Sequence, residues 1–347
     1  MEFAFSSEQE QLREEVRRFA DNEIRPVATE YDVAEEFPHD VVDAAAEMGL
    51  TGAGIPMEYG GAGYSTLEVA MIVEELFAAD PGIGLSITAT SFGADAIEAF
   101  GTEDQKERFL EPVARGDAIM GAAISEPDVG SDVSAVSTRA EKDGDEWVID
   151  GNKMWITNGS VGDHFVVLCD TDPEAEDRYA GFSQIVVESD RDGFEADKIE
   201  GKLGIRASDT AELIFDGVRV PEENLIGEAG AGFLQQMQFF DDTRTAVAAQ
   251  GVGIAKGAAE RALDYAGERE QFGRPIGDFQ AIQHKLAEMY TQTEAARMLT
   301  YKSAWSVDEA DDQLTTLASM AKEFASRVAV EVADEAVQIH GGAGYVN

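Results

Sequence analysis

The sequence is poor in the residues that build disulfides and metal clusters. Cys169 is the only cysteine among 347 residues, so no disulfide can form within the chain, and the four histidines lack the spacing of metal ligands. The longest run without a charged residue covers only residues 81–94, whereas a membrane-spanning helix needs ~18–20 apolar residues. The first residues also lack the basic-then-apolar pattern of a secretory signal. We therefore expect a soluble cytoplasmic protein with no metal site and no membrane contact.

Basic residues are scarce as well. Lys and Arg number 26 against 69 Asp and Glu, which gives a net charge of −43. Such a charge repels nucleic acid and anionic membrane surfaces, so neither is an expected partner. The acidic residues are spread along the whole chain rather than collected in a tail. This distribution favours a surface adapted to the high-salt cytosol of a halophile over a docking site for a basic partner.

What the sequence does contain is a helical pattern that changes to a strand pattern and back. From residue 6 to about 118 apolar residues recur at helical spacing, and SSEQEQ and STLEVAM both start with a Ser cap followed by Glu three residues later. From about 119 to 225 short β-branched runs alternate with turns, and Asp143-Gly144 predicts a hairpin. The pattern predicts a multi-domain α+β fold: an N-terminal helical domain (1–118), a small antiparallel β barrel or sandwich (119–226) and a C-terminal up-down helical bundle (227–347).

The C-terminal bundle has only three long helical patterns, the first of nine or ten turns, whereas up-down bundles usually have four helices. We therefore expect an incomplete bundle in a truncated chain, with an apolar groove where a fourth helix would pack. The segment REQFGRPIGDF reads as a polar loop. The stretch GVGIAKG at 251–257 lies inside a helical pattern and follows no strand, so it predicts close helix packing rather than a dinucleotide-binding loop.

Two segments have the composition of a site for a conjugated ring. SEPDVGSD at 125–132 offers hydroxyls and backbone donors, and WITNG at 155–159 offers an aromatic face, a hydroxyl and a turn. A flat ring ligand needs an apolar face with hydrogen-bond donors at its edge. Each segment alone is weak evidence, because a Trp is usually part of the core and Asn-Gly after a strand is usually only a turn.

Taken with six other segments in order, these two make the chain resemble the acyl-CoA dehydrogenase family over nearly its whole length. The matching segments are PMEYGGAGYSTLEVAMIVEEL, FGTEDQKERFLEPVARG, SEPDVGSD, KMWITNG, GKLGIRASDTAELIFDGVRVP, DDTR, REQFGRPIGDFQAIQHKLAEM and AVQIHGGAGY. The resemblance implies FAD held between the β domain and the bundle, an acyl-CoA substrate, electron-transfer flavoprotein as electron acceptor, and a homotetramer or homodimer.

The resemblance also implies which residues bind the ligands. Those implied for FAD are Ala122, Ile124, Ser125, Gly130, Ser131, Trp155, Ile156, Thr157, Arg269, Gln271, Phe272, Gln280, Gln338, Ile339, His340, Gly341 and Gly342. Those implied for acyl-CoA are Ser131, Asp241, Asp242, Thr243 and Arg244. The residues from Arg269 to Gln280 would reach the FAD of a neighbouring subunit. An internal salt bridge within the bundle is an equally weighted alternative for Arg244.

The family reaction removes two hydrogens from a saturated acyl-CoA: a Glu takes the α-proton, and the β-hydride goes to flavin N5. Most short- and medium-chain members have that Glu in a segment that would follow Asn347 here, and other members have it at the position of Thr243. No catalytic residue is therefore assigned within the chain. Asp241 and Asp242 are disfavoured as bases, because a helix turns ~100° per residue and neither shares the face of Thr243.

Three hypotheses follow. The first, which we favour, is an acyl-CoA dehydrogenase whose base segment lies beyond the sequence. The second is a catalytically inactive relative that binds FAD or CoA. The third is a relative with other flavin chemistry, such as an oxidase or a monooxygenase.

Overall fold

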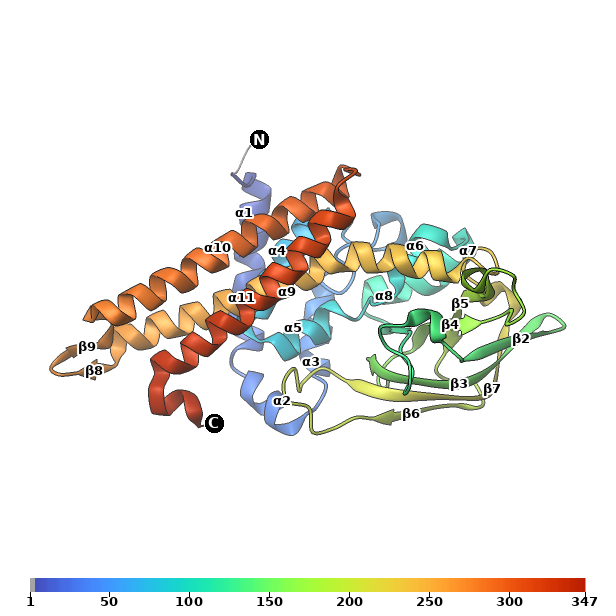
Figure 1. Cartoon of the computed structure of the whole chain (residues 1–347), viewed down its shortest axis with the longest axis horizontal. Coiled ribbons are helices and arrows are strands. Elements are labelled where there is room, and N and C mark those ends of the chain that lie inside the picture. Colours follow the sequence, from blue (N-terminus) through green and yellow to red (C-terminus); the bar gives the residue numbers. More distant parts are fainter. Residues whose placement is uncertain (1–3, 347) are drawn as a thin grey trace. The chain divides into compact units, whose positions relative to one another are not determined.

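The computed structural model describes residues 4–346, which form two compact units built from segments far apart in sequence (Figure 1). Unit 1 takes the residues up to 28, then 65–84, and those from 241 onward. Unit 2 takes residues 29–64 and 85–240. The helical, strand and helical thirds expected from the periodicity are all present, which confirms the predicted fold class. The proposed domain boundaries at 118 and 226 remain a prediction.

Unit 1 is helical. Its main helices are α1 (Ser7–Phe19), α4 (Thr66–Ala79), α9 (Gly232–Glu268, within the unit from residue 241), α10 (Gln280–Asp308) and α11 (Leu314–His340). A hairpin of β8 (Glu270–Gln271) and β9 (Arg274–Pro275) joins α9 to α10. Helix α9 is the single helix of about ten turns that the sequence predicts. The expected polar loop is wrong in its detail, since that segment pairs as the β8–β9 hairpin.

Helix starts in unit 1 follow the capping logic of the sequence. Ser65 accepts a hydrogen bond from the backbone N–H of Glu68, whose side chain accepts one from the Ser65 backbone, which is the predicted capping box of α4. The box of α1 is shifted by one residue from the expected pair, because Ser6 is the cap and Gln9 its partner. Each box satisfies backbone donors that the first turn of a helix leaves unpaired.

Helix α4 packs against α9, although the two are separated by more than 150 residues. A Cβ atom at Gly253 would lie 2.6 Å from the carbonyl oxygen of Glu74, and one at Gly257 would lie 2.3 Å from that of Ala78. Both distances are shorter than a side chain tolerates, so only glycine permits this approach of the two backbones. The expectation of close helix packing at GVGIAKG is confirmed. A count of three helices from the C-terminal pattern misses α4 as a further member of the bundle.

Two adjacent carboxylates on α4 are buried in unit 1. Glu74 accepts hydrogen bonds from Arg297 Nε at 3.0 Å and from the Tyr301 hydroxyl at 2.8 Å, and Glu75 is paired with Lys256. A buried carboxylate needs such partners, because an unpaired buried charge is costly. Arg297 and Tyr301 lie on α10 and Lys256 lies on α9, so the pairs tie α4 to both helices.

Unit 2 contains a seven-stranded sheet with short helices. The helices are α2 (Ala28–Ala34), α3 (His39–Glu47), α6 (Ala94–Phe100), α7 (Glu103–Gln105) and α8 (Glu111–Arg115), and α5 (Pro81–Thr88) crosses the boundary between the units in sequence. The strands are β1 (Met120–Ala123), β2 (Arg139–Asp143), β3 (Glu146–Thr157), β4 (His164–Asp170), β5 (Phe182–Glu188), β6 (Phe194–Lys198) and β7 (Thr210–Pro221).

The strand order is β1-β4-β2-β3-β7-β6, with β5 paired to β4. The predicted hairpin is present, since β2 and β3 pair around Gly144, which has φ +69°. The sheet is mixed rather than wholly antiparallel, because β1 runs parallel to β4. Alternation along β4 divides the core: Phe165 and Val167 join the cluster inside the sheet, whereas Val166 packs with Ile97 of α6 and other helical residues.

None of the helices within residues 4–346 combines the length and apolarity that crossing a membrane requires. In the same range no three His, Cys, Asp or Glu side chains are grouped as metal ligands.

Candidate functional site

The two segments expected to bind a ring, SEPDVGSD and WITNG, lie side by side in unit 2. The backbone N–H of Met154 donates to the carbonyl oxygen of Ser125 at 2.9 Å, which joins β3 to the SEPDVGSD segment. A Cβ atom at Gly121 would lie 3.0 Å from the carbonyl oxygen of Thr157, so β1 also approaches the end of β3. Segments about 30 residues apart in sequence thus meet beside the end of β3.

Trp155 is displayed on the surface rather than buried. Its side chain is 63% exposed and its backbone has φ +65°. The register between β3 and β7 shifts between Lys153 and Ile156, so an irregularity of the bulge type interrupts the alternation of the strand. As a result Ile156, which is 3% exposed, points into the core in place of Trp155. A non-glycine residue in this conformation costs ~1–3 kcal/mol, and such strain clusters at functional sites.

The other residues implied for FAD in unit 2 differ in exposure. Ala122 and Ile156 have buried side chains, and Ile124 packs partly against the small core cluster around Leu168. The more exposed residues lie after them in each segment: Ser125 and Thr157 are half-buried, whereas Gly130 and Ser131 are exposed. A Cβ atom at Gly130 would meet nothing within 4 Å, so backbone donors there are accessible.

The turn after Trp155 is fixed by a buried amide. Asn158 has φ +63° and is fully buried, and its Nδ2 donates to the carbonyl oxygens of Ala89 at 2.7 Å and Met120 at 3.0 Å. Next to it Asp209 accepts hydrogen bonds from the backbone and the hydroxyl of Ser160. The Asn-Gly turn is therefore a rigid support for the exposed indole.

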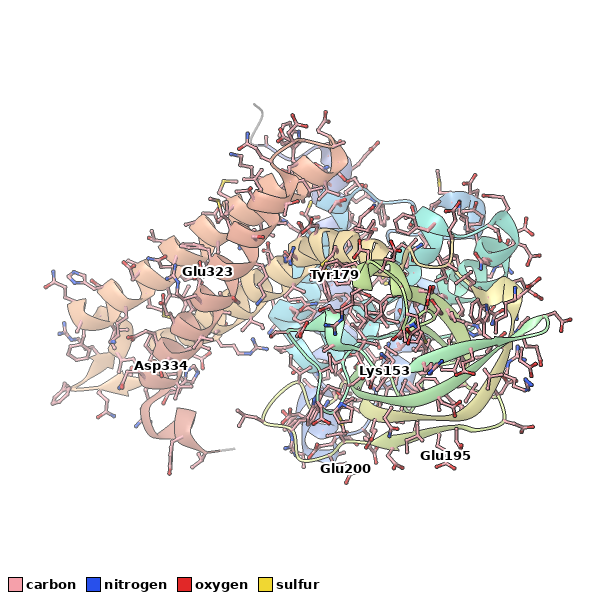
Figure 2. All side chains as sticks on the ribbon, turned by 45° about the vertical axis from the view of Figure 1, so that its right-hand side comes forward. Lys153, Tyr179, Glu195, Glu200, Glu323 and Asp334 are labelled. Atoms are coloured by element: carbon pink, nitrogen blue, oxygen red, sulfur yellow. The ribbon has the colours of Figure 1, made fainter. Side chains whose placement is uncertain are left out.

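A buried ion pair between Lys153 and Glu126 joins the same two segments and was not expected from the sequence. Its Nζ–Oε1 distance is 3.0 Å, and the side chains are 0% and 4% exposed. Figure 2 shows Lys153 on β3 within the strands of unit 2. The sequence could have indicated that Lys153 is buried, because strand alternation puts it on the same face as the buried Trp147 and Ile149.

Unit 1 contains the second set of residues implied for FAD. Arg269, Gln271, Phe272 and Gln280, in and after the hairpin, are all exposed, and Phe272 is 94% exposed with φ +54°. The end of α11 lies at the same end of the bundle, because the His340 ring stacks on Tyr265 of α9 at 4.5 Å between centroids.

The final motif presents its residues unevenly. Gln338 and the glycines at 341 and 342 are exposed, His340 is half-buried, and Ile339 is buried in the bundle core. Gly341 has φ +59°, which is a glycine conformation at the end of α11. The helix end with a glycine turn, expected from the sequence, is therefore present.

The residues implied for acyl-CoA lie on α9. Asp241 is paired with Arg244, and its other oxygen accepts a hydrogen bond from the Thr315 hydroxyl at 2.9 Å. The internal salt bridge considered for Arg244 therefore exists, although both side chains remain partly exposed. Thr243 is half-buried, and the side chain of Asp242 lies outside the described residues.

Within unit 1 the two sets of ligand residues lie far apart. Helix α9 carries Arg244 near its start in the unit and reaches the hairpin after Glu268, so ~36 Å of helix lies between them. The hairpin and the end of α11 are brought together, but neither is brought near the DDTR segment.

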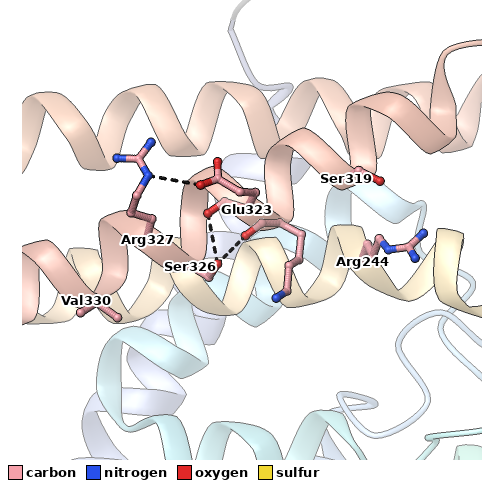
Figure 3. Close-up of a pocket in the computed structure, with 7 residues that line it drawn as sticks. Arg244, Ser319, Glu323, Ser326, Arg327 and Val330 are labelled. Carbon is pink, nitrogen blue, oxygen red and sulfur yellow. Dashed lines mark hydrogen bonds and ion pairs between the residues drawn. The ribbon is translucent and has the colours of Figure 1, made fainter. Parts of the chain in front are cut away.

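A groove of about 480 Å³ runs between α9 and α11 beside Arg244 (Figure 3). It is lined by Arg244, Ser319, Lys322, Glu323, Ser326, Arg327 and Val330. Val330 is the one apolar residue among those that line it, and the apolar groove expected beside a missing helix stays a prediction. Figure 3 shows that Ser326 and Glu323 are already engaged, the former with backbone carbonyls of its own helix and the latter with Arg327.

The arrangement in unit 2 fits a flat conjugated ring such as flavin. Trp155 provides an exposed aromatic face, the half-buried hydroxyls of Ser125 and Thr157 lie on the adjoining segments, and Gly130 leaves backbone accessible. No described residue of this group has the pattern of a metal ligand set.

Three family models match the chain along most of its length. They are described as the acyl-CoA dehydrogenase N-terminal domain over residues 6–117, the middle domain over 121–218 and the C-terminal domain over 230–347. A protein of Clostridium acetobutylicum described as "Acyl-CoA dehydrogenase, short-chain specific" is 42% identical over 346 residues, which cover 99% of this chain and 90% of that protein.

Solved structures are similarly close. Butyryl-CoA dehydrogenase from Megasphaera elsdenii superimposes with a TM-score of 0.95 and 39% identity, over 100% of this chain and 91% of that one. A chain in a structure described as electron transferring flavoprotein of Acidaminococcus fermentans has a TM-score of 0.96 and 41% identity, over 100% of this chain and 90% of that one.

Proposed function

We propose that this chain, which belongs to the acyl-CoA dehydrogenase family, catalyses the FAD-dependent α,β-dehydrogenation of an acyl-CoA thioester. The family membership inferred from the motifs is confirmed, and with it the class of oxidoreductase. The finer assignments, namely the ligand residues, the base, the electron acceptor and the assembly, are our proposals.

The observation that carries the proposal is Trp155, held at φ +65° and 63% exposed beside Ser125. An indole that sits on a strained backbone and is mostly exposed to water gains little from burial, so its position is best explained by a ligand that covers it. Trp155 and Thr157 would flank the flavin ring from one side, and the segment from Ala122 to Ser131 would run along the other. Bound FAD would supply the acceptor of the β-hydride at its N5 atom.

The protein must also weaken the bond to the α-proton of the thioester. Hydrogen bonds to the thioester carbonyl stabilise the developing enolate, and such donors are worth ~3–4 kcal/mol each. A Glu in an apolar site takes the proton, because burial brings its pKa closer to the working pH. We assign that role to none of the described residues of this chain.

The described residues of the DDTR segment suit binding better than proton abstraction. Thr243 has no group that titrates near neutral pH, and Asp241 already accepts hydrogen bonds from Arg244 and Thr315. We propose that Arg244 contacts the acyl-CoA while its pair with Asp241 orients it. In the adjoining groove Arg327 is paired with Glu323, while Lys322 adds a further cation, and this cation favours an anionic ligand in a chain of net charge −43.

We propose that the protein acts as a homodimer or homotetramer. The exposed Phe272 and Gln271 lie ~36 Å along α9 from Arg244 of the same chain, and this separation supports a role for them at the FAD of a second copy. Sedimentation velocity should therefore give a dimer or larger, and a monomer that binds FAD with full affinity contradicts this assembly. We also propose that electrons leave through electron-transfer flavoprotein, as the similarity to a chain in such a structure supports.

An anaerobic titration tests the function. The FAD-loaded protein is mixed with acyl-CoAs from short to long and branched chains, and bleaching of the visible flavin band is recorded. Bleaching by at least one saturated acyl-CoA, with no bleaching by CoA alone, is expected. Bound FAD that no acyl-CoA bleaches favours the inactive FAD- or CoA-binding relative instead, and a protein that binds no FAD rules out both.

A further inference from the structure

The Glu126–Lys153 pair is unusually complete for a pair of buried charges. Glu126 Oε1 accepts from Lys153 Nζ at 3.0 Å and from the backbone and hydroxyl of Thr138 at 2.8 and 2.7 Å. Its Oε2 accepts from the backbone and hydroxyl of Ser137 at 2.9 and 2.7 Å. Lys153 Nζ also donates to the carbonyl oxygen of Ile124 at 3.0 Å. Both oxygens of the carboxylate are therefore saturated with donors.

These partners make Glu126 a fixed anion rather than a proton carrier. Burial would raise the pKa of its carboxyl, but the charge of Lys153 and the hydrogen bonds from Thr138 and Ser137 outweigh burial and hold the pKa at about 2. A buried carboxylate with this pKa, both of whose oxygens are occupied by donors, is a weak proton acceptor, so we assign Glu126 no role as general base.

Stability alone does not account for the pair. A buried ion pair gains little over apolar residues of the same volume, because desolvation offsets the attraction between the charges. An apolar pair would make no directional hydrogen bonds, whereas the ion pair bonds to Ile124, Ser137 and Thr138. A pair that fixes the register of two segments is the best-attested use of buried charge.

The segments fixed in this way are the two that flank the proposed flavin site. Glu126 follows Ser125 directly, and Lys153 is two residues before Trp155 and at the edge of the register shift that displays the indole. Together with the bond from Met154 to Ser125, the pair links three consecutive residues of one segment, 124–126, to Lys153 and Met154 of the other. A movement of the pair would therefore move Ser125 and Trp155 relative to each other.

We propose that Glu126 and Lys153 are positioning residues, which hold Ser125 and Trp155 at the separation that a bound flavin ring requires. The inference rests on the proposed function, and it concerns binding and orientation of the ring rather than the chemical step.

The test uses FAD titration of the full chain after its flavin has been removed. Lys153→Met is compared with Lys142→Met, the same change at a half-exposed lysine of the same sheet whose partner is Glu222. We expect Lys153→Met to raise the dissociation constant for FAD about tenfold to a hundredfold. This range is the one found when residues that orient metal ligands are replaced. Lys142→Met should leave it within about twofold, as is usual for surface pairs.

A second readout separates positioning from folding. At saturating FAD, the visible circular dichroism of the flavin should change in Lys153→Met, because the ring then lies differently between the two segments. If the folded Lys153→Met protein matches Lys142→Met in both FAD affinity and flavin spectrum, the inference is wrong, whatever happens to the unfolding midpoint.

A milder variant covers the case in which Lys153→Met does not fold. Thr138→Val keeps the shape of the side chain and the ion pair but removes the hydroxyl that donates to Glu126 at 2.7 Å. We expect a smaller rise in the FAD dissociation constant and a spectral change in the same direction, and an unchanged constant and spectrum would overturn the inference. Failure of the unmodified protein to bind FAD would instead refute the proposed function, on which the inference depends.

Discussion

Adding one methyl group to α9 should have opposite effects at two glycines. At Gly257 the new Cβ atom would lie 2.3 Å from the carbonyl oxygen of Ala78 in α4, whereas at Gly267 it would meet nothing within 4 Å. Both residues lie in the same helix, so the change in intrinsic helix propensity is similar, with a gain of up to ~1 kcal/mol for Ala over Gly.

The expected magnitudes follow from these contacts. Gly267→Ala should stabilise the protein by ~0.5–1 kcal/mol, because only the propensity term acts. At Gly257 the atom in the way is backbone, which has no alternative rotamer, so α4 and α9 must separate. Overpacking of this kind costs ~1–3 kcal/mol, and the two variants should differ in unfolding free energy by ~2–3 kcal/mol.

Urea unfolding followed by far-ultraviolet circular dichroism measures the difference, with salt and FAD concentration held constant for all proteins. The displaced α4 should also loosen the buried pairs of Glu74 with Arg297 and Tyr301. If Gly257→Ala is as stable as Gly267→Ala, then the glycines of GVGIAKG are not required for helix packing, and their role must be sought elsewhere.

Three further predictions concern the site, pH and salt. Trp155→Gly should raise the stability of the flavin-free protein by ~1 kcal/mol, because glycine relieves the strain at φ +65°, while it weakens FAD binding; a variant that binds FAD as tightly as the original speaks against the proposed site. Burial lowers the pKa of His164 despite the nearby carboxylates of Asp163 and Glu188. His164 therefore binds a proton more readily in the unfolded chain than in the folded chain. The unfolding free energy should therefore fall as pH drops below the ordinary histidine pKa of ~6.5, and His164→Gln should make this dependence on pH weaker. The same pH dependence in both proteins would refute the role of His164. Because a charge of −43 repels itself, unfolding free energy should rise with KCl, and an unchanged fold in dilute buffer over weeks would contradict adaptation to high salt.

Periodicity predicts the elements of this fold well because most of them satisfy local rules. Helix α9 follows a helical pattern without a break, Ser65 caps α4 through its own Glu68, and Gly144 makes the β2–β3 turn. Pairings between distant segments are harder. Nothing in residues 66–79 alone indicates that α4 joins α9 and α10, because the partners of its carboxylates on those two helices, Lys256 and Arg297, lie more than 180 residues away.

The candidate site shows the same limit. The motifs identify the family, which the comparisons confirm, but strict alternation along β3 would turn Trp155 toward the core. The register shift before Ile156 reverses that orientation, and a shift of this kind depends on the pairing strand β7 as much as on β3. Alternation along β3 also does not identify the partner of Lys153, because Glu126 lies 27 residues earlier in the sequence.

The rate at which Cys169 is alkylated should report how often the sheet of unit 2 opens. Cys169 lies on β4 and is wholly buried in the core of the sheet, and burial raises its pKa to about 12. Only a thiolate reacts with alkylating reagents, so the folded chain should resist labelling at neutral pH. Each chain that does react has exposed this strand, so the labelling rate reports how often the sheet separates without any engineered probe.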